Sequence, residues 1–140
     1  MSENELEDED EIHVRHKDFE ENLEMQEALA PVVLENLLDF GMEEGQELRV
    51  EYFFYTDSSG KANALATELK KLGYYVWSGH SSYDKTQFLI NGWTIKMSMD
   101  NETMSNWVNR MSTLGYAYDC RFDGWGTSEQ MQDDLPEPEN

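Results

Sequence analysis

The sequence has few basic residues, one cysteine and no long apolar run. Only 10 Lys and Arg stand against 30 Asp and Glu in 140 residues, so the formal net charge at pH 7 is −20. A field of this sign repels phosphate backbones, and we therefore expect no direct binding to nucleic acid. It favours a protein partner with a basic surface, such as a protein that itself binds nucleic acid.

The single cysteine, Cys120, excludes an internal disulfide, and we interpret it as a small buried strand residue. A free thiol fits a reducing compartment. The acidic N-terminus lacks the apolar core of a signal peptide, and no run of about 18 apolar residues is available to span a membrane. We therefore expect a cytoplasmic protein with no membrane segment.

Catalytic signatures are also missing. The sequence has no glycine-rich phosphate loop, no Gly-x-Ser-x-Gly elbow and no His-Glu-x-x-His motif. His80 lies near Ser78, Ser81 and Ser82, but a catalytic triad also needs a group that orients the base. Cys120 lies within a predicted strand, which is a poor position for a nucleophile. We expect no enzyme activity and no cofactor, and an enzyme that uses His80 and Cys120 is the least favoured alternative.

Much of the negative charge lies in two terminal blocks. They predict flexible acidic arms over residues 1–17 and 129–140, with one α+β domain over residues 18–128. Because neither arm has an apolar face to dock, we expect the fold to survive deletion of residues 1–15 and 130–140. His13 and His16 have the spacing of one helical face, but no Cys or third His lies near them. A solvated arm is therefore favoured over a metal site.

Periodic patterns predict an additional N-terminal helix followed by β-α-β-β-α-β. The first helix starts at Asp18 with a stripe of Phe19, Leu23, Gln26, Ala30, Val33 and Leu37, and Pro31 kinks or splits it. Later helices end at Gly73 and Gly115. Strands are predicted over residues 46–55, 74–90, 93–99 and 116–122, with a hairpin turn at Asn91-Gly92.

This order predicts a ferredoxin-like sandwich, in which two helices cover one face of an antiparallel sheet. Aromatic side chains fall on the opposite face: Phe53, Tyr55, Tyr75 and Trp77. In RNA-binding domains of similar topology, bases stack on such aromatics. Since few basic side chains surround them here, cover by the N-terminal helix or by a partner is the favoured interpretation.

The last predicted strand leads into a distinctive stretch. Asp123-Gly124 and Gly126 are expected to end this strand in a turn, with Trp125 held between two glycines. Trp125 either plugs the end of the sheet or contacts a partner, as tryptophan often does at interfaces. We predict that the partner-binding residues are Asp123, Gly124, Trp125, Gly126 and Thr127.

Three segments resemble a known family. Residues 122–127, Phe-Asp-Gly-Trp-Gly-Thr, resemble the "YDGWGT" signature of the regulator of ribonuclease activity B family, which inhibits ribonuclease E. The helix end Leu-Leu-Asp-Phe-Gly at 37–41 and the junction Leu-Lys-Lys-Leu-Gly-Tyr-Tyr-Val at 69–76 are similar to that family as well. The resemblance spans roughly residues 30–128. This sequence departs from the family in its short tail after the signature and in the loop that Asn91-Gly92 replaces.

The resemblance implies a non-enzymatic cytosolic protein that binds a ribonuclease and lowers or redirects its activity. The acidity fits an alternative equally well: an immunity-type or nucleic-acid-mimic protein that neutralises a toxin nuclease.

Overall fold

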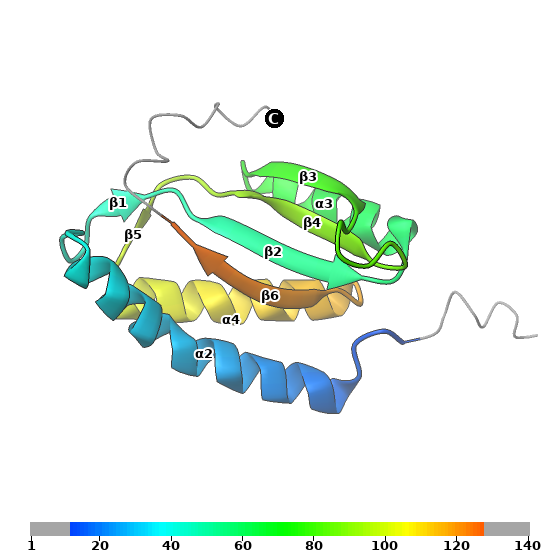
Figure 1. Cartoon of the computed structure of the whole chain (residues 1–140), viewed down its shortest axis with the longest axis horizontal. Helices are drawn as coiled ribbons and strands as arrows, with labels where there is room; N and C mark the ends of the chain where they lie inside the picture. The colour runs from blue at the N-terminus through cyan, green and yellow to red at the C-terminus, as the bar shows by residue number, and fades with distance from the viewer. Residues whose placement is uncertain (1–11, 128–140) are drawn as a thin grey trace, which may run out of the picture.

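The computed structural model describes residues 12–127, and Figure 1 shows how their elements are arranged. The described elements are α2 (His16–Asp39), β1 (Glu47–Leu48), β2 (Glu51–Thr56), α3 (Ser59–Lys71), β3 (Tyr75–His80), β4 (Phe88–Trp93), β5 (Met97–Ser98), α4 (Asn101–Ala117) and β6 (Arg121–Gly126). Four strands form an antiparallel sheet in the order β3-β4-β2-β6, and β1 pairs with β5 separately. The predicted α+β fold with an N-terminal helix is confirmed. The sheet order is that of a ferredoxin-like sandwich.

One face of the sheet, covered by α3 and α4, forms the core. On β2, Tyr52, Phe54 and Thr56 are fully buried, whereas the residues between them stay partly exposed. Successive strand residues point to opposite faces, so this alternation assigns the covered face. Each helix supplies apolar side chains at helical spacing: Ala62, Leu65, Ala66 and Leu69 from α3, and Met104, Trp107, Val108 and Met111 from α4.

The N-terminal helix α2 lies beside α4 and along the edge strand β6 (Figure 1). It continues through Pro31 as one helix, so Pro31 does not split it. Its buried residues are Asn22, Gln26, Ala30 and Leu34, which differ in part from the predicted stripe. Phe19 is only partly buried and stacks on Tyr116 of α4, with ring centroids 4.2 Å apart. The face of α2 that meets the domain is therefore partly polar.

The predicted hairpin turn at Asn91-Gly92 is wrong. Both residues lie inside β4, and the polar segment 81–87 joins β3 to β4 instead. A Cβ at Gly92 would lie 1.8 Å from the Tyr75 carbonyl oxygen, which accepts a 2.7 Å hydrogen bond from the Tyr52 hydroxyl. This glycine therefore marks a close approach to its neighbours, not a turn. The predicted return strand 93–99 is reduced to β5.

The predicted end of the last helix at Gly115 is also wrong. α4 continues to Ala117, so the strand predicted over residues 116–122 begins only at Arg121. A Cβ at Gly115 would lie 2.7 Å from the Phe54 ring and 2.8 Å from the Cys120 carbonyl oxygen. Glycine at this position lets the helix pack closely against the sheet.

The predicted turn at Asp123-Gly124 is part of β6. The strand runs through to Gly126, and its pairing with β2 shifts register between Phe53 and Phe54. Phe54 pairs with Phe122 and Phe53 with Gly124, so Asp123 is the extra residue of a β-bulge. The positive φ of 126° at Gly124 belongs to this bulge.

The predicted boundary between arm and domain, after residue 17, falls inside α2. Val14, which precedes the helix, is only 5% exposed, so residues just before the helix pack on the domain. Residues 1–11 and 129–140 of the predicted arms lie outside the described residues, as does residue 128 at the end of the predicted domain. Between residues 12 and 127, no helix combines the length and the apolar character that a membrane crossing requires.

Candidate functional site

The sheet face opposite α3 and α4 carries a group of aromatic side chains, which we call the open face. They come from three neighbouring strands: Phe53 and Tyr55 of β2, Tyr75 and Trp77 of β3, and Trp93 of β4. The rings of Tyr75 and Trp93 stack, with centroids 4.1 Å apart and an interplanar angle of 5°. Trp77 is 46% exposed and the other four are half-buried. Because α2 lies at the edge of the sheet, it leaves Trp77 exposed.

Trp125, the centre of the predicted site, points to the covered face. It pairs with Tyr52 in the register, and its ring meets that of Trp107 at an interplanar angle of 87°, with centroids 6.2 Å apart. The side chain is half-buried and packs against the core. This packing is the geometry of a plug at the end of the sheet.

The other four predicted site residues have different surroundings. Gly124 and Gly126 lie where an added Cβ would meet no atom within 4 Å. The Thr127 hydroxyl donates a hydrogen bond to the Arg49 carbonyl oxygen. Asp123 lines a cavity beside β6. The Asp123 carboxylate is thus offered to a space that a ligand can enter.

The cavity has a volume of about 730 Å³ and lies between α2, β6 and the β3–β4 connection. Its polar and aromatic lining includes Asp18, Glu21 and Asn22 from α2, Tyr55 from β2, Tyr83 and Asp84 from the connection, and Arg121 and Asp123 from β6. We call it the β6 cavity. No local sequence pattern predicts this cavity, because its walls come from segments that lie far apart in the chain.

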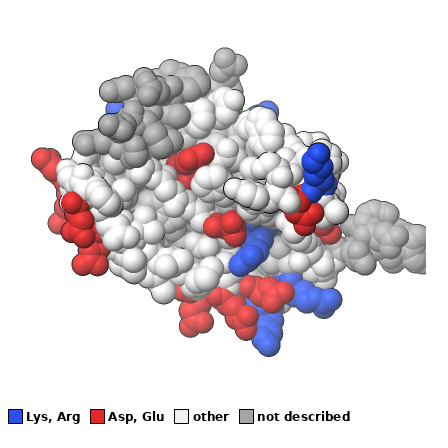
Figure 2. Space-filling view, in the orientation of Figure 1, with Lys and Arg blue, Asp and Glu red and all other residues white. Residues whose placement is uncertain are grey.

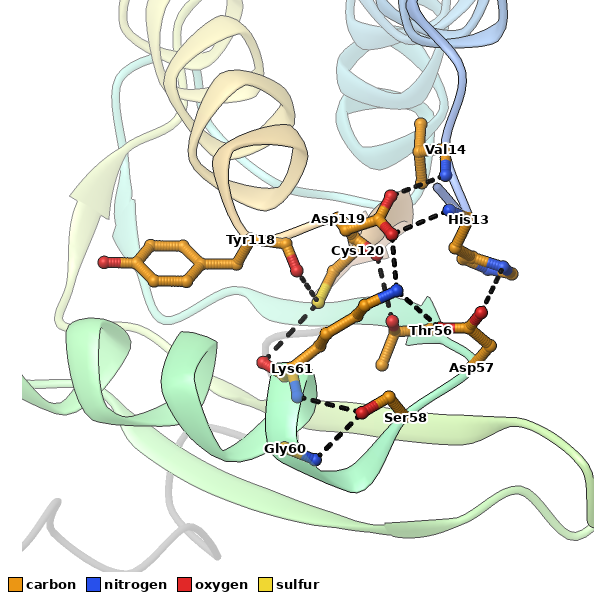
Figure 3. Close-up of polar contacts among 10 residues, drawn as sticks. All are labelled: His13, Val14, Thr56, Asp57, Ser58, Gly60, Lys61, Tyr118, Asp119 and Cys120. Atoms are coloured by element: carbon orange, nitrogen blue, oxygen red, sulfur yellow. Dashed lines mark hydrogen bonds and ion pairs between the residues drawn. The ribbon is translucent and has the colours of Figure 1, made fainter. Parts of the chain in front are cut away.

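One wall of the β6 cavity is held by the carboxylate of Asp119. This carboxylate accepts hydrogen bonds from the backbone N–H groups of His13 and Val14 at 2.7 and 2.6 Å, as Figure 3 shows. It also accepts one from Lys61 Nζ at 2.6 Å, and Lys61 bonds Asp57 at 3.0 Å. Burial alone would raise the pKa of Asp119, but the hydrogen bonds from Lys61, Val14 and His13 lower it. Asp119 thereby ties the segment before α2 to the sheet.

The opposite wall, the β3–β4 connection, is ordered by its own hydrogen bonds. The Ser81 hydroxyl oxygen accepts hydrogen bonds from the N–H groups of Tyr83 and Asp84, at 3.1 and 3.4 Å. The Asp84 carboxylate accepts from both the N–H and the hydroxyl of Thr86, and these bonds lower the pKa of Asp84. Both walls are thus held in place by local contacts.

Titrating groups in the β6 cavity influence one another. Partial burial raises the pKa of Asp123, although the charge of Arg121 acts in the opposite direction. Arg121 Nη1 lies 3.9 Å from Asp123 Oδ1, a loose ion pair. Burial also raises the pKa of Tyr55, and Asp123 and Tyr83 add to this effect. Burial therefore disfavours the negatively charged forms of both Asp123 and Tyr55 on this side of the cavity.

Cys120 and His80 have surroundings unlike those of catalytic residues. Burial raises the pKa of the Cys120 thiol to about 12, so it stays protonated at neutral pH. The thiol is 1% exposed. His80 stacks on Phe88, and its Nδ1 lies 3.1 Å from the Lys85 carbonyl oxygen. The His80 imidazole therefore has a backbone carbonyl as its hydrogen-bond partner.

His13 and His16 likewise have protein partners. His16 Nε2 lies 3.1 Å from a Glu20 carboxylate oxygen, and its Nδ1 lies 3.3 Å from the Tyr116 hydroxyl. His13 Nδ1 lies 4.0 Å from Asp57. Within residues 12–127, no three His, Cys, Asp or Glu side chains are grouped so that they could hold a metal ion.

Figure 2 shows how charge is distributed on the side of the molecule seen in Figure 1. The middle of this face, over the strands, carries few charged side chains. Asp and Glu lie along the border formed by α2 with Lys or Arg among them, and Asp and Glu alone are seen at the end where α2 leads into β1. A centre with few charges inside a charged rim resembles the anatomy of a protein-binding surface.

A sequence model of the family described as regulator of ribonuclease activity B matches residues 31–127. The match begins within α2 and ends one residue after β6, and it covers more than half of the 140 residues. The chain belongs to the regulator of ribonuclease activity B family. No curated protein matches the chain.

Membership in the regulator of ribonuclease activity B family confirms the suspected resemblance. The family name describes regulation of ribonuclease activity, which implies a ribonuclease as protein partner and a regulatory role in place of a catalytic one. The matched range contains the open face, Asp123 and Asp119, whereas the first half of α2 precedes it.

Proposed function

We propose that this chain acts in the cytoplasm on a ribonuclease of the ribonuclease E type, and inhibits or modulates it by binding a basic segment of that enzyme. The observation that carries the proposal is the open aromatic face within an acidic border. Exposed aromatic side chains supply much of the free energy of protein binding, because they bury a large area at low entropic cost. The net charge of −20 speeds encounter with a basic segment.

The proposed mechanism is competition for basic side chains. Lys and Arg contacts with phosphates supply much of the affinity of a protein for RNA. A regulator that covers some of these side chains removes them from RNA binding, so RNA affinity falls and its salt dependence becomes weaker. The chain performs no chemical step in this mechanism.

Residues 123–127 contribute to this contact in different ways. We assign the direct contact to the Asp123 carboxylate and to the bare backbone at Gly124 and Gly126. Trp125 supports the strand from the covered side, and the Thr127 hydroxyl holds its end against Arg49.

The experiment measures the binding of the purified full chain to ribonuclease E, together with the effect on RNA cleavage. Trp77→Ala should raise the Kd by about 10-fold or more, mainly through faster dissociation. Phe40→Ala is the matched control: Phe40 is also an exposed aromatic, 89% exposed, but it lies at the end of α2. It should leave the Kd unchanged.

Two results would contradict the proposal. If the Trp77→Ala and Phe40→Ala variants bind ribonuclease E with the same Kd, the open face is not part of the interface. Failure of the unaltered chain to bind ribonuclease E, together with tight binding to a toxin nuclease, would favour the immunity-type alternative.

A further inference from the structure

We propose that the β6 cavity binds an arginine side chain of the partner. The inference rests on the proposed function, because it specifies how a basic segment of the ribonuclease is recognised. It adds a specificity-determining site beside the open face, and this site selects one chemical group, the guanidinium.

The first observation is an oxygen atom without a hydrogen-bond donor. Asn22 lines the cavity and is 7% exposed, and its Nδ2 donates a 2.7 Å hydrogen bond to the Phe122 carbonyl oxygen. Because a carbonyl oxygen only accepts, this bond fixes the orientation of the amide. The other amide atom, Oδ1, is buried with no hydrogen-bond partner. A buried acceptor without a donor is unfavourable, so a ligand that donates to it is stabilised.

The second observation is an excess of carboxylates. Four of them line the cavity, those of Asp18, Glu21, Asp84 and Asp123, against the single guanidinium of Arg121. Arg121 is 49% exposed at its side chain and lies 3.9 Å from Asp123, so it leaves most of this acceptor capacity unused. The cavity therefore favours a cation over an anion or a neutral group.

The third observation selects among cations. Tyr55 and Tyr83 line the cavity, and aromatic faces attract a planar guanidinium by stacking and by cation–π interaction. A guanidinium also presents five N–H donors in a fixed fork, which suits separate acceptors such as Asn22 Oδ1 and the Asp123 carboxylate. A lysine ammonium is more strongly hydrated and has three donors at one point. The cavity lining therefore matches arginine better than lysine.

The site also adjoins the open face. Tyr55 belongs to both, because it lies on the open side of β2 and lines the cavity. A basic segment that crosses the aromatic face can place one arginine in the cavity. The hydrogen bonds of Asp119 and Ser81 already hold the two walls, which lowers the entropic cost of binding.

The direct test titrates the full chain with Nα-acetyl-arginine amide and follows side-chain amide signals by NMR. The Asn22 amide signal is expected to shift on binding. The citrulline analogue, which keeps the shape without the charge, and the lysine analogue, which keeps the charge without the fork, should each bind about 10-fold more weakly. An unmoved Asn22 signal, or equal affinity for the three compounds, overturns the proposal.

The second test uses the complete partner. Asp123→Asn should raise the Kd for ribonuclease E by about 10-fold. Asp39→Asn removes the same charge at the exposed end of α2, and should change the Kd by less than about 2-fold because surface charges there are screened. If the unaltered chain binds and both variants bind equally well, the cavity proposal and the assignment of Asp123 as a contact both fail, whereas regulation through the open face stands. If the unaltered chain does not bind ribonuclease E but arginine amide still shifts Asn22, the proposed function fails and the cavity proposal stands.

Discussion

The two faces of the four-stranded sheet are both aromatic, yet they differ in burial. Phe54 points to the helices and is 0% exposed, whereas the adjacent Phe53 is half-buried on the open face. Gly115 and Gly92 allow close approach to the covered face, where an added Cβ would lie under 3 Å from its neighbours. On the open side, added Cβ atoms at Gly124 and Gly126 meet nothing within 4 Å. Aromatic content alone therefore does not separate a buried core face from a partly exposed face of the sheet.

The largest effect should come from truncating the same residue type on each face. Phe54→Ala should lower the free energy of unfolding by about 3–5 kcal/mol, because it leaves a cavity beneath the helices. Phe53→Ala should lower it by about 1 kcal/mol or less, since no helix within residues 12–127 covers the open face. Urea unfolding of both variants measures the difference. Equal losses would mean that the open face is a second core.

A smaller effect should come from adding one methyl group to glycines of β4 and β6. Gly92→Ala should lower the free energy of unfolding by about 2–3 kcal/mol, because the Tyr75 carbonyl and the Tyr52 hydroxyl must move. Gly126→Ala is the matched control, with open space at its Cβ position and no positive φ. It should change the midpoint of unfolding little. If Gly92→Ala lowers the free energy of unfolding as little as Gly126→Ala does, this part of the sheet is loosely packed.

These glycines explain where prediction from the sequence ended. The sequence correctly placed Phe53 and Tyr55 on the sheet face away from the helices, because burial along a strand follows a period of two. Asn91-Gly92 has the composition of a turn, but the atoms that require glycine at position 92 belong to β2 and β3. A local pattern cannot contain such a contact. The same holds for Gly115, which approaches Phe54 from another element.

The candidate site was predicted less completely than the fold. Tyr55 and Asp123 were singled out from the sequence, but the β6 cavity needs α2 and the β3–β4 connection to come together in space. One signal was available: Asn22 and Gln26 are polar side chains one turn apart on a docked helix, and both are buried. Polar residues at buried positions often mark hydrogen bonding or a site.

The cavity wall gives a prediction that depends on pH. Asp119→Asn should lower the free energy of unfolding at pH 7 by about 1–2 kcal/mol, because hydrogen bonds to a charged carboxylate are lost. Asparagine also tolerates the left-handed backbone at this position, where φ is 59°, so the change tests the charge. Urea unfolding at pH 7 measures the loss.

The sign of the pH effect follows from the lowered pKa of Asp119 in the folded state. Its stabilisation is complete above the ordinary value of 3.8 and disappears as the pH falls through the folded-state pKa. The two proteins should therefore become equally stable in acid. A constant difference down to that pH would show that the carboxylate charge is not what holds the wall. Deletion of residues 1–15, compared with deletion of 1–11, should reproduce part of the same loss, since Val14 is buried.

The smallest effect is an expected absence of binding. The open face resembles a base-stacking surface in its aromatics, but the chain has 30 acidic residues against 10 basic ones. Stacking contributes about 1–3 kcal/mol per base, whereas phosphate contacts supply most of the non-specific affinity, and those contacts are repulsive here. We expect no measurable affinity for single-stranded RNA or DNA at physiological salt. Fluorescence anisotropy with labelled oligonucleotides tests this. The anisotropy should stay at the value of the free oligonucleotide with the unaltered chain and with the Phe53→Ala and Trp77→Ala variants. Tight binding to an oligonucleotide that is lost in the Phe53→Ala or Trp77→Ala variant would show that the open face binds nucleic acid. The chain would then bind RNA directly in addition to a ribonuclease.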